Sequence, residues 1–115
     1  MTPLATLEQE RHGDIAVARV AGEIDASNAP WLAERLAELV TNRSAELAID
    51  LTETTYLDSA GIAVLFELAT AMTRHRQQLR LVVAEASPIA RMVGLTGLDA
   101  AIPCYATLDA ALAAR

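Results

Sequence analysis

The chain has 115 residues, of which 53% are hydrophobic, and this suits one domain with a single packed core over about residues 4–114. Its net charge is -6 and all nine basic residues are arginines, so the phosphate backbone of a nucleic acid is not an expected partner. The absence of lysine also excludes a Walker-type phosphate loop and Schiff-base chemistry.

The first third of the chain is predicted to form a β-hairpin followed by a helix. Residues 4–10 alternate weakly between apolar and polar side chains and predict an edge strand. Residues 15–21 alternate more clearly and predict its hairpin partner. Residues 26–30 contain Ser, Asn and Pro, as the starts of helices often do. The helix is expected to run to about Thr41, and residues 42–44 are expected to close it.

The middle of the chain is predicted to form a buried strand over residues 47–51, a loop over residues 52–58 and a second helix from about Ser59 to Arg76. Two apolar residues of this helix, Val64 and Leu68, lie off its main apolar stripe. Either the helix is buried on more than one side, which we favour, or these residues form a partly apolar exposed patch. The main stripe consists of Ile62, Leu65, Phe66, Ala69 and Met72.

The last third is predicted to contain a strand over residues 79–84, a short helix from Ser87 to Val93 that ends before Gly94, and a turn over residues 95–99. A short strand over residues 102–105 and a helix capped by Thr107 follow, with Leu108 and Leu112 on the buried side of that helix. Alternating strands and helices require crossover connections. The sequence therefore predicts a single α/β domain, in which about four helices pack on a mixed sheet of four to five strands.

Catalytic and metal-binding interpretations are excluded by spacing. The segment around Ser59 superficially resembles the Gly-x-Ser-x-Gly motif of hydrolases, but Leu57 replaces the first glycine. The two histidines, His12 and His75, lie in a predicted turn and at the polar end of a predicted helix, so neither is expected to serve as a catalytic base. The histidines and Cys104 do not have the spacing of metal ligands. We therefore expect no enzyme activity, no metal and no cofactor.

Three aspartates follow or end predicted strands, where open α/β sheets usually place their sites. Asp50 is interpreted as structural, whereas Asp25 could either shape the start of the first helix or face a partner. Asp58 is predicted to cap the second helix, which would leave the hydroxyl of Ser59 free at its N-terminus. Gly61 is expected to leave room in the first turn for close approach to the backbone.

Four segments together resemble the STAS family (sulphate transporter and anti-sigma factor antagonist), and the resemblance spans nearly the whole chain. The resemblance implies a small bacterial α/β domain that binds an anti-sigma factor, which is itself a serine kinase with an ATPase fold. Phosphorylation of the motif serine ends the interaction, and a serine phosphatase restores it. The most specific of the segments is Asp58-Ser59-Ala60-Gly61, and the others are Gly22-Glu23-Ile24-Asp25, Ile49-Asp50-Leu51 and Leu95-Thr96-Gly97-Leu98.

Carried onto this chain, the resemblance makes Ser59 the expected phosphorylation site, with Thr54 and Thr55 as secondary candidates. The family often has a second serine at the position of Ala60, so Ser59 is the only acceptor within this tetrapeptide. The residues expected to contact the partner are Asp25, Asp58, Ala60, Gly61, Val64 and Leu68.

Two other roles for the same fold stay open. Relatives of this family also serve as accessory subunits of lipid-transport ABC systems or as scaffolds of stress-sensing complexes, without phosphorylation. A sensor of nucleotides or small molecules is a further alternative, although no Gly-rich or lysine-bearing segment supports it. In each case the expected partner is not a nucleic acid.

The sequence predicts a cytoplasmic location. No run approaches the ~20 apolar residues of a membrane span, and the first residues lack the pattern of a secretory signal, so membrane insertion is not expected. The single cysteine, Cys104, cannot form an internal disulfide, which fits a reducing compartment.

Overall fold

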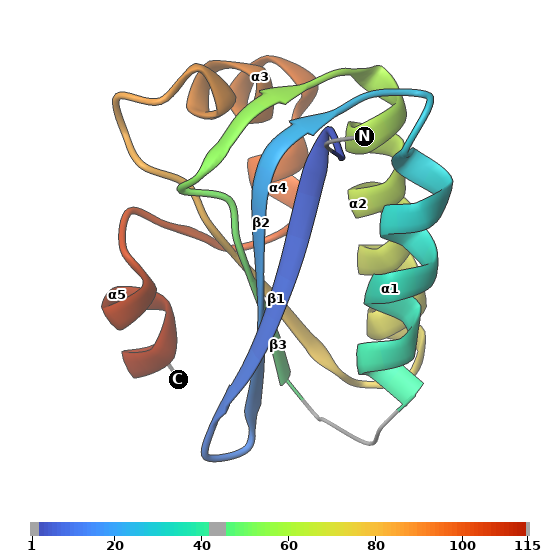
Figure 1. Ribbon diagram of the computed structural model, residues 1–115. Coiled ribbons are helices and arrows are strands. Elements are labelled where there is room, and N and C mark those ends of the chain that lie inside the picture. The colour runs from blue at the N-terminus through green and yellow to red at the C-terminus, as the bar shows by residue number, and fades with distance from the viewer. Residues whose placement is uncertain (1–2, 42–45, 115) are drawn as a thin grey trace.

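A computed structural model describes residues 3–41 and 46–114 of the chain (Figure 1). These residues form six strands and five helices, which confirms the predicted single α/β domain. The predicted turn over residues 42–44 lies outside the described residues. In chain order the elements are β1 (Ala5–His12), β2 (Ile15–Ile24), α1 (Ala29–Thr41), β3 (Glu46–Asp50), β4 (Thr54–Leu57), α2 (Ser59–Arg74), β5 (Gln78–Val82), α3 (Pro88–Thr96), α4 (Leu98–Ala101), β6 (Cys104–Tyr105) and α5 (Leu108–Ala113).

The sheet is mixed, as predicted, and has the order β1-β2-β3-β5-β6. β1 and β2 form the predicted antiparallel hairpin, and the other pairs are parallel. β2 is long enough to have two neighbours on one side: its first half pairs with β3 and its end pairs with β4. This division of β2 places the end of β4, and therefore the start of α2, beside the end of β2.

Two segments differ from the prediction in the kind of element that they form, and other elements differ in their bounds; for example, the strand predicted over residues 102–105 is only Cys104–Tyr105. Residues 52–58 contain the strand β4 and not only a loop. The sequence does not predict this strand because its four residues are too few to show a periodicity, but they suffice to pair with the end of β2. Residues 95–99 are mostly helical: α3 continues through Gly94 to Thr96, and Gly97 ends it with a left-handed φ of 78°. The helix α4 then begins directly at Leu98. The domain therefore has one more strand than the upper end of the predicted range, and one more helix than predicted.

The core lies between the sheet and the helices α1 and α2, which cover one face of it (Figure 1). Alternate strand residues point into this core, among them Val20 and Ile24 of β2 and Leu57 of β4. Val64 is also buried there and Leu68 is half-buried against it, so α2 is buried more widely than one stripe. No helix among residues 3–41 and 46–114 is long and apolar enough to cross a membrane.

The opposite face of the sheet is partly covered by α5 (Figure 1). Thr107 caps this helix as predicted, with its hydroxyl oxygen accepting from the N–H of Ala110 at 3.1 Å. The prediction for its buried side was wrong in detail: Ala111 is fully buried, whereas Leu108 and Leu112 are half-buried. A helix of only six residues does not bring a full apolar stripe against the sheet.

Two charged side chains are buried on this second face. Asp50 accepts hydrogen bonds from the N–H and hydroxyl of Thr52, at 3.0 and 2.7 Å, and pairs with Arg19 at 3.4 Å. Arg80 pairs with Glu46 at 2.7 Å and donates to the carbonyl oxygen of Ala111 at 3.2 Å. The structural interpretation of Asp50 is therefore confirmed, and Arg80 fastens β5 to both β3 and α5.

Candidate partner-binding site

The paired ends of β2 and β4 bring Asp25 and Asp58 to the same edge of the sheet. Ile24 and Leu57 are partners in the parallel register, and each aspartate is the first residue after its strand. The N–H of Asp58 also donates to the carbonyl oxygen of Ile24 at 3.2 Å. Two residues that lie 33 positions apart in the sequence therefore flank one site.

Asp58 is the N-cap of α2, as the sequence predicted. Its backbone is extended, and its Oδ1 accepts from the N–H groups of Ala60 at 2.9 Å and Gly61 at 3.2 Å. A cap of this kind contributes about 1 kcal/mol to stability. The carboxylate of Asp58 is therefore held in the first turn of α2.

Ser59 is the first residue of α2, and its side chain is exposed. It lies at the positive end of the helix dipole, where a negative group is favoured. Its neighbour Asp58 is half-buried and places a carboxylate beside it. An exposed hydroxyl at this position is accessible to a second protein.

Asp25 shapes the turn that leads from β2 into α1. Its carboxylate accepts from the hydroxyl and the N–H of Ser27, and these bonds lower the pKa of Asp25 below its ordinary value. Asn28 completes the turn by accepting from the N–H of Asp25 at 2.9 Å and donating to the carbonyl oxygen of Glu23 at 2.8 Å. Because the pKa is lowered in the folded state, these bonds stabilise the turn at neutral pH, and their contribution is lost as the pH falls through the lowered pKa.

Gly61 does not leave open space for a partner, which corrects the expectation from the sequence. It is buried, and a Cβ atom at this position would lie 2.8 Å from Cγ2 of Ile24 and closer still to Cδ1 of Leu57. The glycine therefore allows the first turn of α2 to pack closely against β2 and β4. Its role is to hold the helix N-terminus, and with it Ser59, against the sheet.

We expect Gly61→Ala to destabilise the domain by about 1–2 kcal/mol. The two close contacts of the added Cβ atom place the overpacking cost in the upper part of its range of about 1–3 kcal/mol, and the gain in helix propensity offsets roughly 1 kcal/mol of that cost. Urea unfolding measures the change. Gly94→Ala is the matched control, since a Cβ atom at Gly94 in α3 would meet nothing within 4 Å, and it should stabilise the domain. A Gly61→Ala variant as stable as the wild type would contradict the packing role.

Two further expected site residues, Val64 and Thr54, are also buried. Val64 is 9% exposed and belongs to the core, so it offers a partner little surface. Leu68, on the same helix, is half-buried. Thr54 is 3% exposed and its hydroxyl donates to the carbonyl oxygen of Val20 at 2.7 Å, which makes it inaccessible as a phosphate acceptor in the folded domain. Thr55 is exposed on β4, and Ala60 is half-buried beside Ser59.

Tyr56 is an exposed residue near Ser59 that the sequence reasoning missed. It is 48% exposed and is the register partner of Glu23, which is also exposed. The prediction of a loop over residues 52–58 concealed it. A strand would have placed Tyr56 on the opposite face from the buried Leu57.

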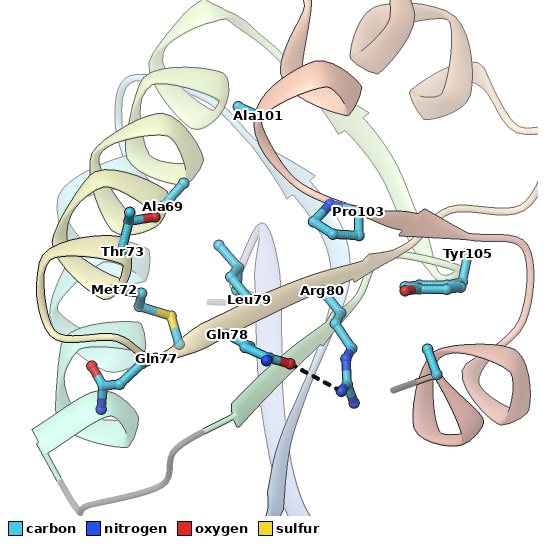
Figure 2. Close-up of a pocket in the computed structure, with 11 residues that line it drawn as sticks. Ala69, Met72, Thr73, Gln77, Gln78, Leu79, Arg80, Ala101, Pro103 and Tyr105 are labelled. Atoms are coloured by element: carbon cyan, nitrogen blue, oxygen red, sulfur yellow. Dashed lines mark hydrogen bonds between the residues drawn. The ribbon is translucent and has the colours of Figure 1, made fainter.

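A cavity of about 360 Å³ lies away from this site, between the second half of α2 and the first residues of β5 (Figure 2). Met72, Leu79 and Tyr105 are among the residues that line it, and Ser59 is not. Its one charged lining residue, Arg80, is held by Glu46 and by Gln78 at 3.3 Å. Because this cation is already paired, the cavity gives no support to a nucleotide sensor.

Among the residues described, no group of three His, Cys, Asp or Glu side chains could hold a metal ion.

Comparison with known protein families finds one family whose model matches nearly the whole chain. The model of the STAS domain matches residues 6–111. The chain belongs to the STAS domain family. The resemblance seen in the sequence is thereby confirmed, and Ser59 lies at the junction of β4 and α2 in this STAS domain.

Two curated relatives of this STAS domain are named as antagonists of anti-sigma factors. The anti-sigma-F factor antagonist RsfB of Mycobacterium tuberculosis is 34% identical over 102 residues, which cover 88% of this chain and 81% of the relative. An anti-sigma-B factor antagonist of Listeria monocytogenes is 37% identical over 91 residues, or 79% of each chain. Both names describe a binding role and not a catalysed reaction, in keeping with the expectation that this chain is not an enzyme.

A solved structure agrees with these relatives. The crystal structure of an anti-sigma factor antagonist from Mycobacterium paratuberculosis superimposes with a TM-score of 0.82 at 32% identity, over 94% of this chain and 91% of that one. The STAS domain described above therefore has the same architecture along almost its full length.

Proposed function

We propose that this STAS domain is an anti-sigma factor antagonist whose binding is switched by phosphorylation of Ser59. The unmodified domain binds an anti-sigma factor that is also a serine kinase with an ATPase fold, and the phosphorylated domain is released. A separate serine phosphatase restores binding, and the cycle takes place in the cytoplasm. The names of the two relatives and of the solved structure support the first part of this proposal.

One observation carries the switch: the exposed Ser59 begins α2 directly beside the carboxylate of Asp58, which caps that helix. In the transfer, the Ser59 oxygen bonds to the γ-phosphorus of ATP while the bond to the β-phosphate oxygen breaks. ADP leaves, and the hydroxyl proton passes to a base of the kinase. The STAS domain supplies the acceptor and needs no catalytic group of its own.

The direction of the switch follows from charge. A phosphate adds about -1.5 to -2 charges. In the free domain the N-terminus of α2 favours such a group by roughly 0.3–1 kcal/mol, so the fold tolerates it. In an interface the same phosphate would be desolvated beside Asp58, and leaving a buried charge unpaired costs on the order of 2–5 kcal/mol. Because this cost in the interface exceeds the stabilisation at the helix N-terminus, phosphorylation favours release of the partner.

The test is phosphate transfer from labelled ATP by the purified anti-sigma factor of the same organism. We expect transfer to the wild type and to Thr55→Ala, an exposed neighbour that serves as the control, and no transfer to Ser59→Ala. Label on the Ser59→Ala variant would show that another residue is the acceptor. If instead the chain recovers an ABC ATPase or many related STAS domains from native extract, one of the other two roles of the fold is correct.

A further inference from the structure

Large apolar side chains that are exposed gather at one end of the domain. Among the described residues these are Leu4, Tyr56 and Leu95, which are 47%, 48% and 74% exposed. We call these three residues the apolar rim. Single exposed apolar residues are ordinary, but a group confined to one end of a small domain marks an interaction surface.

The strand register places two members of the apolar rim, Leu4 and Tyr56, on either side of Glu23. Tyr56 is the register partner of Glu23, and the N–H of Glu23 donates to the carbonyl oxygen of Leu4 at 3.0 Å. Leu95 belongs to α3, which packs against β4, the strand of Tyr56. Figure 1 shows α3, the start of β1 and the first turn of α2 at the same end of the molecule.

The rim is continuous with the site of Ser59. Tyr56 precedes Ser59 by three residues, and three residues span at most about 10–11 Å. Adjacent strands are about 4.8 Å apart, which places Glu23 beside Tyr56 and Leu4 roughly one strand further. A protein interface of standard size buries about 800 Å² on each partner, equivalent to a disc of about 16 Å radius. The footprint of a protein centred on Ser59 is therefore wide enough to include Tyr56.

We propose that the apolar rim is the docking surface on which the anti-sigma factor seats an apolar segment while its active site meets Ser59. This proposal rests on the function proposed above and adds the residues that supply affinity. Aromatic side chains near the centre of an interface often dominate its binding energy, so Tyr56 is the expected anchor. Ser59 then sets the state of the switch, whereas the rim holds the partner.

The test is calorimetric binding of the purified anti-sigma factor to rim variants in a Ser59→Ala background, where phosphorylation of Ser59 does not interfere. We expect Tyr56→Ala to weaken binding at least tenfold, and Leu4→Ala and Leu95→Ala about three- to tenfold each. Leu112→Ala is the matched control and should bind within twofold of the background. Leu112 lines a cavity with Ile15, Glu46 and Gln78, the first residues of β2, β3 and β5, and so lies at the other end of the sheet.

A kinase assay with Ser59 intact separates docking from chemistry. Tyr56→Ala should raise the KM for the STAS domain at unchanged kcat, as expected for a residue that binds but does not react. Affinity of Tyr56→Ala or Leu95→Ala within twofold of the background would overturn the proposal, even if Ser59 is phosphorylated. Conversely, a wild type that is never phosphorylated but loses affinity in both variants would overturn the switch and support the rim. Circular dichroism confirms that each variant is folded.

Discussion

Replacing Ser59 by Asp is expected to lower the affinity of this STAS domain for its anti-sigma factor at least 30-fold. The variant carries a permanent negative charge at the first position of α2, next to the carboxylate of Asp58. An unpaired charge within an interface costs on the order of 2–5 kcal/mol, and 2 kcal/mol corresponds to about 30-fold in affinity. Surface plasmon resonance or calorimetry with the purified anti-sigma factor measures the loss.

Ser59→Asn is the matched control for this experiment, because Asn has nearly the size of Asp but no charge. It should bind within a few-fold of the wild type, whereas Ser59→Asp should not. Both variants should remain as stable as the wild type in urea, since the exposed start of α2 tolerates a negative group. Equal affinities of the Asn and Asp variants would show that size and not charge controls the interface.

Removing the carboxylate of Glu46 is expected to lower the free energy of unfolding by about 2–4 kcal/mol. The side chain of Arg80 is only 5% exposed and pairs with Glu46 at 2.7 Å, so Glu46→Ala leaves a buried cation without its counter-charge. Breaking a fully buried pair costs about 3–5 kcal/mol, and the value here is lower because Glu46 is 26% exposed and water can reach the site. Chemical denaturation measures the change.

Glu10→Ala provides the comparison. Glu10 pairs with Arg19 at 2.9 Å, a similar separation, but the two side chains are 42% and 34% exposed. An exposed pair contributes about 0–1 kcal/mol, so this variant should be at least 1 kcal/mol more stable than Glu46→Ala. Equal losses in the two variants would mean that burial of Arg80 contributes nothing to the effect.

Much of the fold follows from local patterns in the sequence. The hairpin of β1 and β2, the helix caps at Asp58 and Thr107, and the buried strand β3 each depend on residues that are close in sequence. β4 and α4 have four residues each, too few to show a periodicity. They form because β2 extends beyond β3 and offers a second partner, and because Gly97 takes a left-handed conformation.

The site residues also fall into two groups: those that the local sequence predicts, and those whose surroundings depend on contacts between distant segments. Ser59 and Asp58 were predictable because a strand, a cap and a helix adjoin in the sequence. The sequence does not reveal the packing role of Gly61, because Leu57 and Ile24, which lies 37 residues before Gly61, both come against it only when β2 and β4 pair. Thr54 was named as a secondary acceptor because its burial likewise depends on a long-range contact, with Val20. Tyr56 is not predicted as a site residue, because its exposure opposite the buried Leu57 follows only once residues 54–57 are known to form a strand.

The division of β2 between two neighbours keeps the central ladder of the sheet apart from the strand that precedes Ser59. The ladder of β2, β3 and β5 is built by residues 15–19, 46–50 and 78–82, whereas β4 pairs only with the last residues of β2. A substitution at an exposed position of β4 therefore leaves the hydrogen bonds of the central ladder unchanged. The surface beside Ser59 can therefore be redesigned by substitutions on β4 while the central ladder keeps its stability.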